Sequence, residues 1–259
     1  MGANQFSFRY FTVRQERCAM KVGTDSVLLG AWAPGGSRIF DIGCGTGILS
    51  LMMAQRFPTA LITAIDIDRG AAEQTRENAD GSPWGERITV MNASLQDFAE
   101  SSYRQVEDMR KSDLGDDVKE NLNNPSNDKV VGFRIFDAII CNPPYFVDSL
   151  KAKGASRTMA RHTDTLSFRD LLRYSAQLLT DDGTASFIIP AQAESDFTLE
   201  AMLAGLNIYK RCVVRSKPSA APKRVMLSFT KQRPAEVEES DITIGDAAYI
   251  ALTQEFYIN

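Results

Sequence analysis

The chain has 259 residues, of which 44% are hydrophobic and 24% are charged, a composition typical of a globular protein with an ample core. It contains no apolar run near the ~20 residues of a membrane helix, and its first ten residues lack a signal-peptide pattern. Four scattered cysteines and one histidine argue against a disulfide framework and a zinc site. We therefore expect a cytoplasmic protein without a metal.

The formal net charge of −4 does not suggest a nucleic-acid binder, but the charge is unevenly distributed. Residues 135–235 carry a net +5 and residues 1–37 a net +2, whereas residues 236–259 carry −6. A polyanion responds to local charge and not to the total. The two basic segments are therefore the candidate nucleic-acid faces.

Residues 1–37 place aromatic side chains among arginines and then lead into a short predicted helix that ends near Trp32. Thr24 is the predicted N-cap of this helix. Two interpretations stay open. The segment is a covering strand and helix, or Lys21 and Thr24 face a bound anionic group.

A strand at residues 38–42, a glycine turn at 43–47 and a helix from Ile48 to about Phe57 follow. Glycines allow close approach of a ligand to the backbone, and a helix N-terminus offers unpaired N–H groups. The next predicted strand, residues 61–65, is followed by Asp66, which suits ribose hydroxyls. Together these features predict a nucleoside-bearing cofactor.

The spacing of the glycines distinguishes between two such cofactors. A dinucleotide fingerprint requires its third glycine one position after Gly47. Asp41, just before the turn, suits a cationic amine better than a pyrophosphate. Both features favour S-adenosyl-L-methionine over a dinucleotide.

A helix at residues 69–79 and a third strand at 88–91 come next, and Ser94 and Leu95 then border the expected adenine pocket. Asp97 lies slightly further along. Residues 101–134 are rich in Ser, Asp, Asn, Lys and Gly without a sustained apolar period. We expect a solvated excursion there, with disorder as one possibility, and not a separate domain.

Residues 138–141 form an apolar run typical of a strand buried on both faces, and Asn142-Pro-Pro-Tyr145 ends it. Two prolines force the backbone to leave the sheet in a rigid shape. This presents an amide, a proline carbonyl and an aromatic ring at the carboxyl end of a strand, where ligands bind in α/β sheets. An isolated Asn-Pro pair is often only a strand stop, and the upstream glycine turn favours a site.

Residues 146–168 are long, basic and irregular, which favours a substrate-binding loop. The remaining predicted elements are a helix at 168–179 capped by Ser167, a strand at 183–189, a second helix at 193–203 and a closing pair of strands at 208–214 and 225–230. Docked aromatics are predicted at residues 256–258. This alternation predicts one doubly wound α/β domain over residues 1–259, with a mostly parallel sheet, an antiparallel C-terminal strand pair and an N-terminal cap at 1–37.

Residues 41–47 (Asp-Ile-Gly-Cys-Gly-Thr-Gly) and 142–145 resemble the cofactor loop and catalytic turn of class I S-adenosylmethionine-dependent methyltransferases of the amino-group type, which have a Rossmann-like fold. More narrowly, the chain resembles the bacterial tRNA1(Val) adenine-N6-methyltransferase family. That likeness rests on residues 11–13 and 19–25, Ala160-Arg-His162, the proline-rich stretch to Arg224, and Phe256-Tyr257.

The resemblance implies methylation of the N6 amine of adenosine 37, beside the anticodon of tRNA. We expect a monomer. It implies catalytic roles for Asn142, Pro143 and Tyr145 and substrate contacts for Pro144, Arg161, His162 and Arg224. The cofactor residues that it implies are Lys21, Thr24, Asp41, Gly43, Cys44, Gly45, Gly47, Asp66, Ile67, Ser94 and Leu95. Two features depart from the family: the excursion at 101–134 is longer, and Ser94 stands where many relatives have an acid.

Three alternatives remain. A protein-glutamine N5-methyltransferase acting on a release factor uses the same turn, but such enzymes carry a helical domain before the first strand, and only 37 residues precede Arg38. An rRNA adenine-N6-methyltransferase is the second alternative. An RNA-binding scaffold that retains the cofactor fold without turnover is the third.

Overall fold

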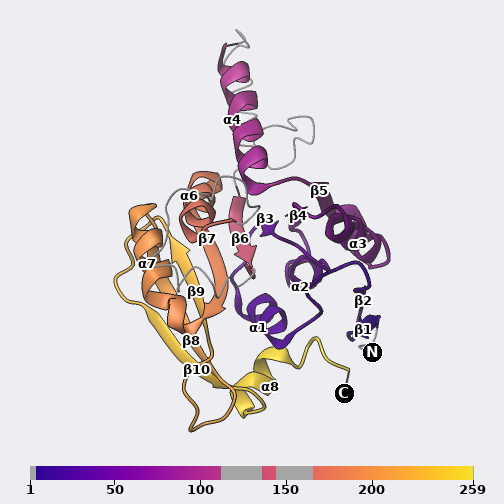
Figure 1. Ribbon diagram of the computed structural model, residues 1–259, viewed down its shortest axis with the longest axis vertical. Helices are drawn as coiled ribbons and strands as arrows, with labels where there is room; N and C mark the ends of the chain where they lie inside the picture. The colour runs from indigo at the N-terminus through magenta and orange to yellow at the C-terminus, as the bar shows by residue number, and fades with distance from the viewer. Residues whose placement is uncertain (1–3, 112–135, 144–165, 259) are drawn as a thin grey trace, which may run out of the picture.

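The computed structural model describes residues 4–111, 136–143 and 166–258. Within these ranges an eight-stranded sheet has the order β10-β8-β9-β7-β6-β3-β4-β5 (Figure 1). Its parallel part is formed by β3 (Arg38–Ile42), β4 (Leu61–Asp66), β5 (Ile88–Asn92), β6 (Phe136–Cys141) and β7 (Leu179–Pro190). The antiparallel strand β9 (Arg224–Thr230) separates β7 from β8 (Asn207–Arg215), and β8 pairs in parallel with β10 (Glu238–Thr243).

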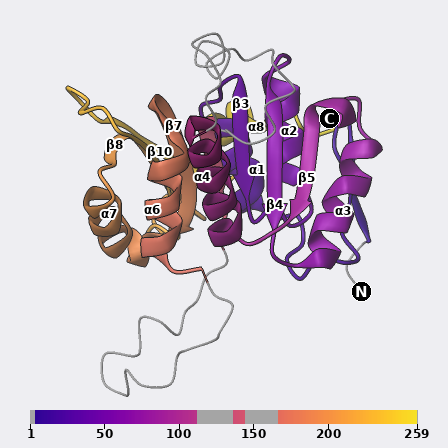
Figure 2. The same cartoon turned by 90° about the horizontal axis from the view of Figure 1, so that it is seen from above.

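Helices cover both faces of this sheet (Figure 2). One face carries α1 (Thr24–Trp32), α2 (Ile48–Arg56) and α8 (Ala247–Thr253), and the other carries α4 (Leu95–Lys111), α6 (Phe168–Leu178) and α7 (Glu194–Leu203). Adjacent residues of β3 point to opposite faces: Ile39 joins the core under α1 and α2, and Phe40 joins the core under α4 and α6. The predicted doubly wound α/β fold with an antiparallel ending is confirmed.

The expectation of a loop from residue 101 is wrong for residues 101–111, which belong to α4. Ser94 begins this helix, because its hydroxyl accepts a hydrogen bond from the backbone N–H of Asp97 at 3.0 Å. Phe98 and Ala99 anchor its first turns in the core, and the remainder extends away from the sheet (Figure 1). A helix that leaves the core needs no continuous apolar stripe, so its sequence is polar like that of a loop. Residues 112–135 lie outside the described ranges.

The start of α1 also corrects a prediction. Gly23, in extended conformation, is the N-cap, and Thr24 is the first helical residue. The acidic tail contains two further elements that the sequence did not suggest, β10 and α8. Phe256 is 1% exposed and Tyr257 stacks on Phe8 at 6.0 Å between ring centroids, so the predicted docking is confirmed for these two aromatics. It is wrong for Ile258, which is exposed.

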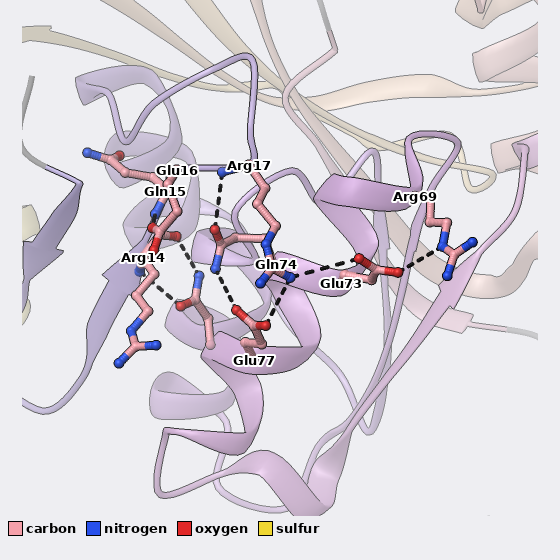
Figure 3. A network of polar contacts seen from close by, with 9 residues as sticks. Arg14, Gln15, Glu16, Arg17, Arg69, Glu73, Gln74 and Glu77 are labelled. Atoms are coloured by element: carbon pink, nitrogen blue, oxygen red, sulfur yellow. Dashed lines mark hydrogen bonds and ion pairs between the residues drawn. The ribbon is translucent and has the colours of Figure 1, made fainter.

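The N-terminal arm (residues 4–22) contains the hairpin of β1 (Gln5–Ser7) and β2 (Thr12–Arg14) and lies on α3 (Arg69–Asp80). The Asn78 side chain pairs with both backbone groups of Arg14, at 2.9 Å and 2.8 Å. Arg17 forms an ion pair with Glu77 at 2.9 Å, within the wider polar network of Figure 3. These contacts hold the arm in place, and its last residues then cross the carboxyl edge of the sheet.

Asp41 is a fully buried carboxylic acid in the middle of β3. Its Oδ2 accepts hydrogen bonds from the backbone N–H and the hydroxyl of Ser50 on α2, at 3.0 Å and 2.6 Å. Its Oδ1 is buried without a partner among the described residues. Burial raises the pKa of Asp41 to about 7, because the charged form loses its hydration and the two Ser50 bonds offset only part of that cost.

Asp41→Asn should therefore change stability in a pH-dependent way. With a native pKa near 7 and an unfolded pKa near ~3.9, the folded wild type binds more protons between these values, so its stability falls as pH rises through that window. Asparagine keeps an acceptor for Ser50 without the charge. At pH 8 we expect the free energy of unfolding of the variant to exceed that of the wild type by up to roughly 4 kcal/mol. This difference should approach zero near pH 4. Urea unfolding without cofactor measures it.

The exposed substitution Asp80→Asn controls for the change in net charge. If Asp41→Asn changed the free energy of unfolding by the same amount at pH 5 and pH 8, this would contradict the raised pKa of Asp41.

Candidate active site

A cavity of about 560 Å³ opens at the carboxyl ends of β3, β4, β5 and β6. The N-terminal arm and the start of α4 close its sides. The residues that line it are Cys18, Ala19, Met20, Ile42, Gly43, Gly45, Ile65, Asp66, Ile67, Asp68, Ala71, Ala93, Ser94, Leu95, Gln96, Asp97, Cys141, Asn142, Pro143 and Leu166. Both sequence signals, the glycine turn and the Asn-Pro turn, therefore reach the same cavity.

The glycine turn forms one wall. Gly43, Gly45 and Gly47 have φ values of +69°, +55° and +77°, which side chains rarely tolerate. A Cβ on Gly43 or Gly45 would meet no atom within 4 Å, so at these two positions the cavity reaches the backbone itself. At Gly47 a Cβ would lie 2.8 Å from Cγ2 of Thr75 on α3, so the third glycine serves packing.

Asp66 stands beside this wall at the end of β4. Its two carboxylate oxygens accept hydrogen bonds from the backbone N–H groups of Gly45 at 2.8 Å and of Asp68 at 2.9 Å. Burial raises the pKa of Asp66, and the two backbone bonds oppose the shift. The acid therefore holds the glycine turn in shape while it lines the cavity.

The far wall is formed where α4 begins. Ser94 donates its hydroxyl proton to Oδ2 of Asp97 at 2.7 Å, and both residues line the cavity with Leu95. Asp97 brings a carboxylate to this wall three residues after Ser94. The capping geometry of the helix places both residues at this wall, because the N-cap and the third helical residue share one side.

Asn142 and Pro143 border the cavity from β6. The Asn142 side-chain nitrogen donates to the Ser26 hydroxyl on α1 at 2.9 Å. An amide whose nitrogen is held has its oxygen on the opposite side. The first turn of α1 therefore sets the orientation of this side chain.

Five other predicted cofactor residues do not line the cavity: Lys21, Thr24, Asp41, Cys44 and Gly47. The Lys21 ammonium donates a hydrogen bond to the backbone oxygen of Gln15, and the Cys44 sulfur accepts one from the Thr75 hydroxyl. Their cofactor contacts stay predictions.

Of the predicted substrate residues, Arg224 lies in the described ranges and forms an ion pair with Asp25 of α1 at 2.7 Å. Pro144, Tyr145, Arg161 and His162 lie outside the described residues.

Several residues of the lining were not predicted as site residues from the sequence. Cys18, Ala19 and Met20 arrive because the arm is bonded to α3, a contact between segments more than 50 residues apart. Asp68 and Ala71 belong to the turn and first residues of α3, and Leu166 precedes α6. Proximity to Asp66 in the sequence was the only available hint, and it applied to Asp68 alone.

The described residues contain no group of three or more His, Cys, Asp or Glu side chains arranged to hold a metal ion. Among the helices of the described ranges, none has both the length and the hydropathy that crossing a bilayer requires.

Comparison with known proteins agrees with this geometry. A family model described as a methyltransferase domain matches residues 39–107. In fold, the chain is similar to a predicted O-methyltransferase from Agrobacterium tumefaciens, with a TM-score of 0.58, 18% identity, and coverage of 90% of this chain and 96% of that one.

Two curated relatives are much closer in sequence. A protein of Phocaeicola vulgatus is 43% identical over 98% of this chain and 97% of its own length, and one of Bacteroides fragilis is 41% identical over the same shares. Both are named tRNA1(Val) (adenine(37)-N6)-methyltransferase. Similarity at this level over nearly the whole length shows that the chain belongs to the tRNA1(Val) (adenine(37)-N6)-methyltransferase family.

Proposed function

We propose that this enzyme transfers a methyl group from S-adenosyl-L-methionine to the exocyclic N6 amine of adenosine 37 in tRNA1(Val). The names of the curated relatives support the substrate, and the methyltransferase domain supports the cofactor. The observation that carries the proposal is the amide of Asn142 at the rim of a cavity floored by two glycines.

The residues of the cavity fit S-adenosylmethionine in shape and charge. The bare backbone at Gly43 and Gly45 leaves room for the methionine part. The Oδ1 of Asp41, buried and without a partner among the described residues, would supply negative potential toward a cationic ligand when this acid is ionised. We assign the ribose hydroxyls to Asp66 and the adenine to the wall of Ile67, Ser94 and Leu95, with Asp97 added.

The bound cofactor would supply a methyl group activated by a positive sulfonium. Adenine's amine is a weak nucleophile, because its lone pair is delocalised into the ring. The Asn142 side-chain oxygen and the Pro143 carbonyl oxygen are two acceptors for its two N–H bonds. Accepting both protons favours the lone pair leaving the ring plane, so these residues act by positioning and electrostatics.

A base in a folded RNA must leave its stack to reach this cavity. Tyr145 is our candidate to receive it face-on, and Pro144, Arg161 and His162 are candidate substrate contacts. A single domain over residues 1–259, a monomeric state and a cytoplasmic location also remain predictions.

The direct test incubates the protein with methyl-labelled S-adenosylmethionine and, in separate reactions, undermodified tRNA1(Val), a release factor or rRNA, and then identifies the labelled nucleoside or amino acid and its position by mass. We expect N6-methyladenosine at position 37. Label in a release-factor glutamine or in rRNA would favour the alternative enzymes, and no transfer to any of the three would favour a scaffold.

Asn142→Ala should keep cofactor affinity nearly unchanged and lower kcat by on the order of 100-fold, the scale of losing one preorganised polar group. Single-turnover methylation and cofactor titration measure the two quantities. Asn207→Ala is a matched control, because that amide bonds to the Lys231 backbone at the other end of the sheet. Equal rates for the wild type and Asn142→Ala would refute the assignment.

Ser26→Ala should lower kcat about fivefold, because one hydrogen bond that orients the Asn142 amide is worth ~1 kcal/mol. The KM for cofactor should change little, and Ser26→Thr, which keeps the hydroxyl, should restore most of the rate. Ser82→Ala removes a serine bond to the Ala79 backbone and serves as control. An unchanged kcat, or a Thr variant as slow as the Ala variant, would show that Ser26 does not act through Asn142.

A further inference from the structure

The basic side chains on β8 and β9 are mostly neutralised within the fold. On the described residues of these strands, Lys210 pairs with Glu238 at 3.4 Å, Arg215 with Asp241 at 2.9 Å and Arg224 with Asp25 at 2.7 Å. Arg211 likewise pairs with Glu194. The basic side chains of β8 and β9 are therefore largely compensated by carboxylates of the same fold.

The connection between β8 and β9, residues 216–223, is the exception. It carries Lys217 and Lys223 and no acidic residue. Both lysines are exposed, and within the described part of the chain neither takes part in an ion pair. The nearby carboxylates have other partners: Asp25 and Asp241 pair with arginines, and Asp246 accepts from the backbone N–H groups of Thr243 and Tyr249.

The connection is held in a defined shape. The Lys223 backbone N–H donates to Val214 at 3.0 Å, that of Ala220 donates to Lys217 at 3.0 Å, and the Arg215 side chain donates to the Ala220 oxygen at 3.0 Å. Pro218 and Pro222 restrict the backbone further. Binding through such a segment costs little conformational entropy.

Its position follows from the register of the sheet. Arg224 lies opposite Pro190 at the end of β7, and β7 pairs in parallel with β6. The lysines therefore lie at the same edge as Asn142, with Lys223 displaced by two strands, or roughly 10 Å, and Lys217 by three, or roughly 14 Å. Figure 1 shows β8 and β9 on the side of β7 away from β4 and β5, whose ends form the cofactor cavity.

Contacts through α1 confirm that the two regions are close. Arg224, next to Lys223, is bonded to Asp25, and the neighbouring Ser26 is bonded to Asn142. One helical turn thus spans the distance between the basic connection and the catalytic amide. An RNA whose base reached Asn142 would have its flanking backbone near this edge.

We propose that Lys217 and Lys223 bind the phosphates of the RNA next to the target adenosine. The proposal rests on the proposed function and names the substrate surface of that same site. Phosphate contacts of this kind set the position of a nucleic acid without reading its sequence. They also release counterions, so they appear in the salt dependence of binding.

The test measures binding of undermodified tRNA1(Val) at several salt concentrations, together with methylation kinetics. For Lys217→Gln/Lys223→Gln we expect the tRNA Kd to rise roughly tenfold and the slope of log K against log salt to fall by about 0.7 per lysine. Each single variant should show about half the change in slope. Cofactor affinity and melting temperature should stay at the wild-type values.

Arg233→Gln is the matched control, because Arg233 is exposed and follows the opposite end of β9. It should leave the slope unchanged. Two results would overturn the proposal in an enzyme that still methylates tRNA. One is a double variant with the wild-type Kd and slope, and the other is an Arg233→Gln variant whose Kd and slope change as much as those of the double variant. A wild type that methylates no tRNA would instead refute the proposed function.

Discussion

The pairing of β3 with β4 on one side and β6 on the other determines where the candidate active site lies. Asp41 of β3 is in register with Ala64 of β4 and Ile140 of β6, so the three strands end at nearly the same level. Asp66, the last residue of β4, and Gly43 and Asn142, which directly follow β3 and β6, then meet at one cavity. A parallel sheet is required for this, because antiparallel neighbours would place alternate ends on opposite edges.

Helix α1 connects the two halves of the site. Its first turn supplies Ser26 to the Asn142 amide and Asp25 to Arg224 of β9. Its later residues, from Val27 to Trp32, are buried in the core against the sheet and α2. The Asn142 turn and the basic connection are therefore both bonded to one rigid element, which would keep the proposed RNA surface, two to three strands away, aligned with the cavity.

Most of the parallel sheet could be predicted from the sequence, because fully buried strands such as β3 and β6 are short apolar runs bounded by glycine or proline. The glycine turn and Asn142 could also be predicted, because each directly follows one of these strands and is marked by glycines or prolines. Helix α4 was missed altogether, since a helix that for most of its length leaves the core has no apolar stripe to detect. Strand β10 was missed because its charges are balanced by Lys210 and Arg215 of β8, which only the fold brings together.

The site contacts that escaped prediction are those between distant segments. The lining by Cys18 and Met20 depends on bonds from the arm to α3, and the Ser26 bond spans 116 residues. The measurement that tests the account most directly is a crystal structure with S-adenosylhomocysteine and an adenosine-containing RNA stem-loop. It should show the sulfur beside Gly43 and Gly45 and the adenine amine within hydrogen-bond distance of the Asn142 oxygen. A base held elsewhere, or an Asn142 amide turned into the protein interior, would contradict it.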